Sequence, residues 1–168
     1  MKRIKKLEKF SDARGWSLND IYAEFRKYSM SSNKLDRYAS SGADAGNCPD
    51  FQVNYSILHP GVIKAWHRHK YQDDYFCVLH GNAQVGIFSE ELSEDGKLRG
   101  PEKHFIGETN PAIIHIKAGE WHGLTAVGNE PVGLLYLVTR KYDPQNPDEE
   151  RAACENFAPE GWWLPENK

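Results

Sequence analysis

The sequence predicts an all-β domain that forms either a barrel or a two-sheet sandwich. From residue 51 onward, short runs rich in Val, Ile, Tyr and Phe alternate with turn signals such as HPG at 59–61 and HGN at 80–82. No helical pattern separates these runs. Seven or more short strands joined in this way pack as a sandwich or close into a barrel.

The first 50 residues are expected to form an arm with one short helix between Ser17 and Tyr28. Ser17 and Asp20 fit a variant of the capping box that begins many helices. Apolar residues then recur at helical spacing, at Leu18, Ile21, Tyr22 and Phe25.

Residues 51–142 are expected to form the barrel core and residues 143–168 an irregular tail, all within a single domain of residues 1–168. The strands are predicted at 51–58, 62–69, 74–79, 83–88, 112–117, 123–127 and 132–139. The tail contains three prolines and the segment PEGWWLPE, so we expect it to pack tryptophans onto the barrel. A chain of 168 residues is long enough for one such core but not for two.

Composition and charge argue against nucleic acid and membrane partners. The formal net charge is −3, and 21 basic residues are scattered among 24 acidic ones. No apolar stretch reaches the roughly 18 residues needed to cross a bilayer. The basic start MKRIKKLEKF is not followed by the apolar segment of a signal peptide, so we expect a cytoplasmic protein. The cysteines form no CxxC pair, which predicts idle thiols at Cys48, Cys77 and Cys154.

Three histidines and one aspartate have the spacing of a metal site. His67 and His69 stand at i and i+2 in a predicted strand, so both side chains project from the same face. Asp74 begins the next predicted strand, and His122 follows a glycine turn at Gly119. Three imidazoles and a carboxylate suit a divalent iron, manganese, nickel or zinc ion and leave one or two coordination positions open. The alternative is a metal-free polar pocket. The other histidines are interpreted as packed or surface residues: His59, His80, His104 and His115.

The same segments resemble the cupin family. Residues 61–81 are similar to the first cupin motif, with Asp74 in place of the usual glutamate, and IKAGEWH is similar to the second, with Lys117 in place of proline. Four segments resemble the dTDP-4-dehydrorhamnose 3,5-epimerases, which are RmlC-like cupins: SDARGW at 11–16, FQVNYS at 51–56, AGEWHGL at 118–124 and LLYLVTRKYDP at 134–144. The resemblance implies a double-stranded β-helix, or jelly roll, and an isomerase that acts on a nucleotide-linked 4-keto sugar.

The resemblance also implies roles for individual residues. His67 matches the general base that removes a proton next to the 4-keto carbonyl, and Tyr136 matches the proposed acid. An imidazole can accept such a proton, and a phenol can return one from the other face. The implied substrate contacts are Arg14 at the nucleotide diphosphate, Gln52, Asn54 and Lys64 in the pocket lining, and Tyr142 near the aromatics that stack on the base. Plainer explanations exist for two of these residues, since Arg14 would also cap the amino-terminal helix and Tyr136 would also pack in the core.

Two departures from the family pattern point toward a metal-assisted reaction. The family's lysine, which stabilises the enolate oxygen, falls at Asp74, where an anion would repel the developing charge. The aspartate that orients the family's histidine base has no obvious equivalent in this chain. A divalent cation held by Asp74 and the histidines would polarise the keto oxygen instead. A ligating His67 would not be free to act as the base, and Tyr136 or a metal-bound hydroxide would then take that role.

Three functions follow from these observations. The first is a carbohydrate epimerase or isomerase that acts on a nucleotide-linked keto sugar, with or without a metal. The second is a metal-dependent cupin enzyme of another class, such as an oxygenase or a sugar-phosphate isomerase. The third is a non-catalytic barrel that binds a small molecule. We also expect a homodimer, because a barrel with an exposed edge strand has an unpaired row of backbone groups.

Overall fold

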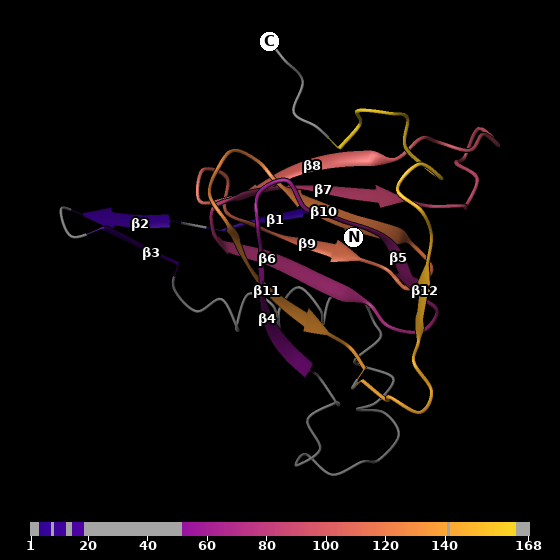
Figure 1. Ribbon diagram of the computed structural model, residues 1–168, viewed down its shortest axis with the longest axis horizontal. Coiled ribbons are helices and arrows are strands. Elements are labelled where there is room, and N and C mark those ends of the chain that lie inside the picture. Colours follow the sequence, from indigo (N-terminus) through magenta and orange to yellow (C-terminus); the bar gives the residue numbers. More distant parts are fainter. Residues whose placement is uncertain (1–3, 8, 13–14, 19–51, 141, 164–168) are drawn as a thin grey trace.

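The computed structural model describes residues 4–7, 9–12, 15–18, 52–140 and 142–163, and these residues form twelve strands and no helix (Figure 1). The first three strands are short: β1 (Ile4–Lys6), β2 (Lys9–Asp12) and β3 (Gly15–Leu18). The others are β4 (Gln52–Leu58), β5 (Ile63–His69), β6 (Asp74–His80), β7 (Asn82–Phe88), β8 (Glu102–Gly107), β9 (Ala112–Ile116), β10 (Trp121–Ala126), β11 (Val132–Val138) and β12 (Glu149–Arg151).

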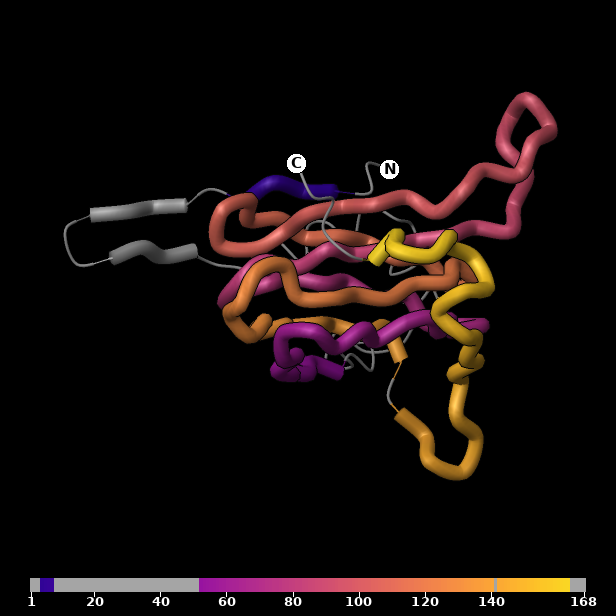
Figure 2. Tube along the Cα trace, turned by 45° about the horizontal axis from the view of Figure 1, so that its top comes forward, coloured from indigo at the N-terminus to yellow at the C-terminus, as the bar shows by residue number. Residues whose placement is uncertain are grey.

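Ten strands form two antiparallel five-stranded sheets that pack against each other (Figures 1 and 2). One sheet has the order β1-β9-β6-β11-β4, and the other has the order β12-β5-β10-β7-β8. Strands β2 and β3 pair with each other in a separate two-stranded sheet. Apart from β7 and β8, strands that neighbour each other within the two large sheets are not consecutive in the chain, as expected for a jelly roll.

The core lies between the two large sheets. Phe76 on β6 and Ile114 on β9 contribute from the first sheet, while Val85 on β7 and Leu124 on β10 contribute from the second. Each of these side chains is at most 3% exposed. Because successive residues of a strand point to opposite faces, one half of each strand supplies this core and the other half faces outward.

The alternation along β4 decides which of its side chains face the interior. Gln52 and Asn54 are half-buried, whereas Val53, Tyr55 and Ile57 are exposed. β4 is also an edge strand, paired on one side with β11. The two polar residues therefore point into the barrel, and an apolar stripe lies on the outside.

The structure confirms the all-β fold class. The seven strands predicted from residue 51 onward correspond to β4–β7 and β9–β11. β8 was missed because its sequence, EKHFIG, alternates weakly and carries three polar residues. The segment predicted to be irregular, residues 143–168, contains the short strand β12.

The predicted helix between Ser17 and Tyr28 is not found. Ser17 and Leu18 belong to β3, where they pair with β2, and residues 19–28 lie outside the described residues. Arg14 also lies outside them. At Ser17 and Leu18, pairing with β2 takes the place of the predicted helix start. No described segment forms a helix long and apolar enough to span a membrane.

The tail covers the outer face of the second sheet. Trp163 packs with Trp66 and Trp121 in a separate apolar cluster, together with Phe88 and Ala158. Gly86 on β7 permits this approach, because a Cβ there would lie only 2.5 Å from an atom of the Trp163 ring. The tail thus holds residues 149–151 beside β5.

Candidate active site

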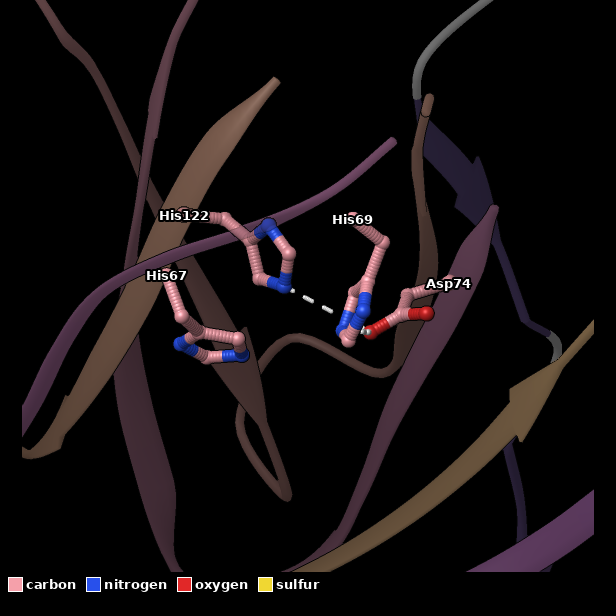
Figure 3. Close-up of side chains that lie close together, drawn as sticks. All are labelled: His67, His69, Asp74 and His122. Carbon is pink, nitrogen blue, oxygen red and sulfur yellow. Dashed lines mark ion pairs between the residues drawn. The ribbon is translucent and has the colours of Figure 1, made fainter. Parts of the chain in front are cut away.

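Three strands bring four polar side chains together inside the barrel. His67 and His69 lie on β5, and His122 lies on β10 directly opposite His67 in the ladder. Asp74 begins β6 in the facing sheet. One possible ligand atom from each residue lies within 4.8 Å of the others, and Figure 3 shows the three rings and the carboxylate as neighbouring side chains. The structure therefore places at one point the four residues whose spacing predicted a metal site.

Two of the imidazoles are held in a defined tautomer. His69 Nδ1 lies 2.7 Å from the backbone oxygen of Asp148, and His122 Nδ1 lies 3.0 Å from that of Glu120. A carbonyl oxygen only accepts hydrogen bonds, so both Nδ1 atoms carry the proton. Each Nε2 is then left with a lone pair. These Nε2 atoms lie 3.8 Å (His69) and 3.4 Å (His122) from Asp74 Oδ2.

The Asp74 carboxylate is held with one oxygen toward the histidines. Its Oδ1 accepts a hydrogen bond of 2.7 Å from Gln72 Nε2, while Oδ2 faces His69 and His122. The side chain is only 4% exposed. Charged groups at such depth are normally paired or bound to a metal, because burying an isolated charge is costly.

His67 differs from the other two histidines in its surroundings. Burial, together with the neighbouring basic side chains of His122, His69, Lys64 and Arg151, lowers the pKa of His67 to about 2. The imidazole is therefore neutral at ordinary pH, with a lone pair free for a proton or a cation. Within the described part of the chain, Asp74 pairs with His69 and His122, but no carboxylate pairs with His67.

The residues present fit a divalent cation. Three neutral imidazoles and one carboxylate form a donor set that iron, manganese, nickel and zinc all accept. His122 Nε2 is buried and has no hydrogen-bond partner, which is rare for a polar atom in a protein interior. Backbone carbonyls that hold the opposite ring nitrogens are the usual support of histidine ligands.

A cavity of about 410 Å³ opens onto this cluster. It is lined by the residues to which the sequence assigned catalysis and substrate contact: His67, Tyr136, Gln52, Asn54, Lys64 and Tyr142. His69 and Asp74 also line it, while His122 is 1% exposed and lies in the wall behind them. A cavity of this size with a few convergent polar groups suits a small polar ligand.

Tyr136 lies on β11 and faces the same cavity from the first sheet. Its ring contacts Phe76 edge-on, with the ring centroids 5.9 Å apart. Burial raises the pKa of Tyr136, and the negative charges of Asp74 and Glu149 raise it further. The phenol is thus a protonated group at neutral pH, suited to donate a proton rather than to accept one.

The polar residues of β4 fix one end of the cavity. Gln52 Nε2 donates to Asn54 Oδ1 at 2.8 Å, and Gln52 Oε1 accepts from the backbone nitrogen of Tyr142 at 3.0 Å. One amide therefore ties β4 to the segment after β11. Lys64 and the Tyr142 side chain are exposed, so they lie toward the opening.

Sequence reasoning missed the contribution of β12. Glu149 and Arg151 line the cavity because β12 pairs with β5, with Glu149 opposite His69 and Arg151 opposite His67. Gln72, which orients Asp74, was also missed. A three-residue strand in a proline-rich tail carries no periodic signal. The position of Gln72, two residues before Asp74, is a signal from which its contact with the carboxylate could have been predicted.

The chain matches one family model and resembles known proteins along much of its length. A model of the family described as "Polysaccharide biosynthesis C-terminal domain" matches residues 47–150. The spore coat polysaccharide biosynthesis protein SpsL of Bacillus subtilis is 35% identical over 150 residues, which cover 89% of this chain and 85% of that protein. A probable low-salt glycan biosynthesis epimerase of Haloferax volcanii is 43% identical over 99 residues, which cover 58% of this chain and 62% of that protein.

A solved structure shares the fold. The crystal structure of a dTDP sugar isomerase from Desulfovibrio desulfuricans matches 98% of this chain and 92% of its own, with a TM-score of 0.69 and 18% identity. The described strands thus have the jelly-roll arrangement of RmlC-like cupins. With a matching family model over residues 47–150 and a relative at 35% identity along most of its length, the chain belongs to the polysaccharide biosynthesis C-terminal domain family.

Proposed function

We propose that this protein is a carbohydrate epimerase or isomerase that acts on a nucleotide-linked 4-keto sugar. The observation that carries the proposal is the single cavity onto which both His67 and Tyr136 face, each in the protonation state its role needs. The names of two matched proteins support the same class, one being a probable epimerase and the other a dTDP sugar isomerase. The substrate enters with its sugar toward the histidines.

The proposed reaction moves a proton at a carbon next to the keto group. His67 accepts the proton through its free lone pair, and Tyr136 returns one from the opposite sheet. Burial and the neighbouring basic side chains lower the pKa of His67. The negative charge that develops on the substrate acts in the other direction, so the proton affinity of His67 rises as the reaction proceeds. Gln52, Asn54, Lys64 and Tyr142 are proposed to hold the rest of the substrate.

A divalent cation is part of the proposal. His69, Asp74 and His122 would hold it, with His67 as a possible fourth donor, and when bound it would polarise the keto oxygen as a Lewis acid. This chemistry replaces a catalytic lysine, whose place is taken by Asp74. The metal-free role of His67 as base and its role as a ligand exclude each other.

Two measurements test the proposal and separate the roles of His67. Incubation with dTDP-4-keto-6-deoxyglucose in heavy water should place deuterium at the carbons beside the carbonyl, and the absence of exchange with this and related nucleotide keto sugars would refute the activity. Metal content should then be compared in the wild type and in His67→Gln. If His67 is the base, the variant loses exchange and keeps its metal, whereas a ligand role predicts the loss of both.

A metal-dependent cupin enzyme of another class is the second candidate. It is favoured by the fixed tautomers of His69 and His122, which suit a permanent metal centre whatever the substrate. Elemental analysis of the purified protein and exchange with keto sugars separate the two candidates. Stoichiometric metal with no exchange would support this second function. If the protein only binds a small molecule, Tyr136→Phe should change the affinity for that molecule and nothing else.

We further propose that the protein is a homodimer. Among the described strands β4 is a sheet edge, and the side chains of Val53, Tyr55 and Ile57 on it are 49–57% exposed. An edge strand that carries an apolar stripe offers a template on which another chain can pair. Sedimentation should give twice the chain mass for the wild type, and Tyr55→Lys should shift the protein toward the monomer. A wild-type monomer would refute the proposal.

A further inference from the structure

The turn before β12 makes an unusual set of contacts with the site. Asp148 precedes β12, and its backbone oxygen accepts the hydrogen bond from His69 Nδ1 at 2.7 Å. Its two side-chain oxygens accept from the backbone nitrogens of Lys70 and Tyr71, at 3.0 Å and 2.9 Å. Asp148 thus accepts hydrogen bonds, through three of its oxygen atoms, from the three consecutive residues His69, Lys70 and Tyr71.

These contacts lock the ring and the backbone of His69 to the same residue. The carboxylate clamp fixes where Asp148 sits relative to the end of β5, and that position decides whether its carbonyl reaches Nδ1. Without the carbonyl, either ring nitrogen could carry the proton, because neutral imidazole exists in two tautomers. The tautomer with the proton on Nε2 would turn an N–H bond toward Asp74 and the other histidines.

Within the described part of the chain, the acceptor for this nitrogen is the backbone oxygen of Asp148. The backbone oxygen of His69 is itself engaged, since it accepts a 2.7 Å hydrogen bond from Gly119. The pairing of Glu150 with Arg68 holds β12 along β5, through an ion pair of 2.6 Å. The strand therefore delivers Asp148 to the one ring nitrogen that points away from the cluster.

We infer that Asp148 is a positioning residue of the active site: its carboxylate clamps the Lys70 and Tyr71 amides so that its carbonyl holds His69 with the Nε2 lone pair facing Asp74 and His122. The inference rests on the proposed function for its purpose, since a fixed lone pair serves a bound cation. The positioning itself is a property of the metal-free protein. His122 is held in the same way by Glu120, but that contact is local to one strand end, whereas Asp148 reaches His69 from 79 residues away.

Two variants and a matched control test the role. Asp148→Ala removes both clamp bonds, while Asp148→Asn keeps one acceptor oxygen and therefore one bond. Asp143→Ala is the control, because this aspartate lies in the same loop and its side chain accepts a hydrogen bond only from the nearby Gln145 amide. Circular dichroism checks that each variant is folded. If Asp148→Ala does not fold, Asp148→Asn takes its place in the measurements.

The first measurement is nitrogen-15 NMR of the imidazoles in metal-free protein. The wild type and Asp143→Ala should show His69 with its proton on Nδ1, and Asp148→Ala should show a mixture of tautomers. The second is titration of metal-free protein with Co²⁺, followed by its visible spectrum. Loss of the clamp should weaken Co²⁺ binding about 10- to 100-fold, as for other groups that support histidine ligands, with Asp148→Asn in between.

The outcomes separate this inference from the proposed metal centre. A wild-type tautomer and affinity in Asp148→Ala would overturn the inference, and so would weaker binding with an unchanged tautomer. A shifted tautomer together with a wild-type protein that binds no Co²⁺ would uphold the positioning and refute the metal centre. Equal losses in Asp143→Ala would also overturn it, because the effect would then belong to the loop as a whole.

Discussion

Acid should destabilise the metal-free protein through His67. Burial lowers the pKa of this imidazole to about 2 in the folded protein, against an ordinary value of 6.5. Between these two values the unfolded chain binds a proton that the folded protein does not, so the free energy of unfolding falls as the pH falls. The stability that the neutral form of His67 contributes is fully present above pH 6.5 and is lost progressively as the pH falls toward 2.

The magnitude between pH 7 and pH 5 follows from the two pKa values. A single imidazole that titrates at 6.5 only in the unfolded chain lowers the free energy of unfolding by about 2 kcal/mol over this interval. The result holds for any folded pKa well below 5, so it depends on the direction of the shift more than on its size. For a chain of this length the melting temperature should fall by roughly 4–8 °C.

Urea unfolding of metal-free protein at pH 7 and pH 5 measures the effect. His67→Gln removes the titrating group and should lose about 2 kcal/mol less than the wild type between the two pH values. His80→Gln is the control, since the His80 side chain is 55% exposed. Equal losses in all three proteins would refute the assignment of the acid sensitivity to His67.

Three further predictions concern single residues. Tyr136→Phe should slow deuterium exchange about 100-fold or more while the substrate still binds, and unchanged exchange rates would remove Tyr136 from the reaction. Gly86→Ala should destabilise the protein by about 1–3 kcal/mol, because its Cβ would meet the Trp163 ring; Gly100→Ala, which meets no atom within 4 Å, should be nearly neutral in the same thermal melts. Burial raises the pKa of Cys77 to about 12, so iodoacetamide at pH 8 should label it only after unfolding, as mass spectrometry would show.

The central strands could be predicted because their sequence pattern and their burial have the same origin. β6 and β7 are buried on both faces; β6 accordingly contains the continuous apolar run YFCVL, and β7 contributes Val85, Ile87 and Phe88 after the turn at residues 80–82. The edge strands β8 and β12 could not be predicted in this way. The sequence of β8 alternates only weakly, and the partner of β12 is the distant strand β5, so local composition does not reveal either strand.

The same division applies to the site. His67 and His69 share a face because of a two-residue period, which is a local property of one strand. The convergence of Asp74 and His122 was predicted from motif spacing. Glu149, Arg151 and the Asp148 contact depend on the register between β12 and β5, and 79 residues separate the two partners of the His69 bond. Such contacts are set by the folded arrangement of the tail.

The aspartate at position 74, which departs from the epimerase pattern, places a buried carboxylate beside the histidines. With the Nδ1 atoms of His69 and His122 engaged by backbone carbonyls, the Nε2 atoms of the two rings face Asp74, whose carboxylate side chain is only 4% exposed. Gln72 satisfies one carboxylate oxygen, but an amide hydrogen bond does not neutralise a buried charge. An aspartate where the epimerase pattern that the sequence resembles has a lysine would make this cavity attract a cation rather than supply one. The Nδ1 contacts of His69 and His122 hold two of the rings before any ion arrives, which would reduce the reorganisation that binding requires.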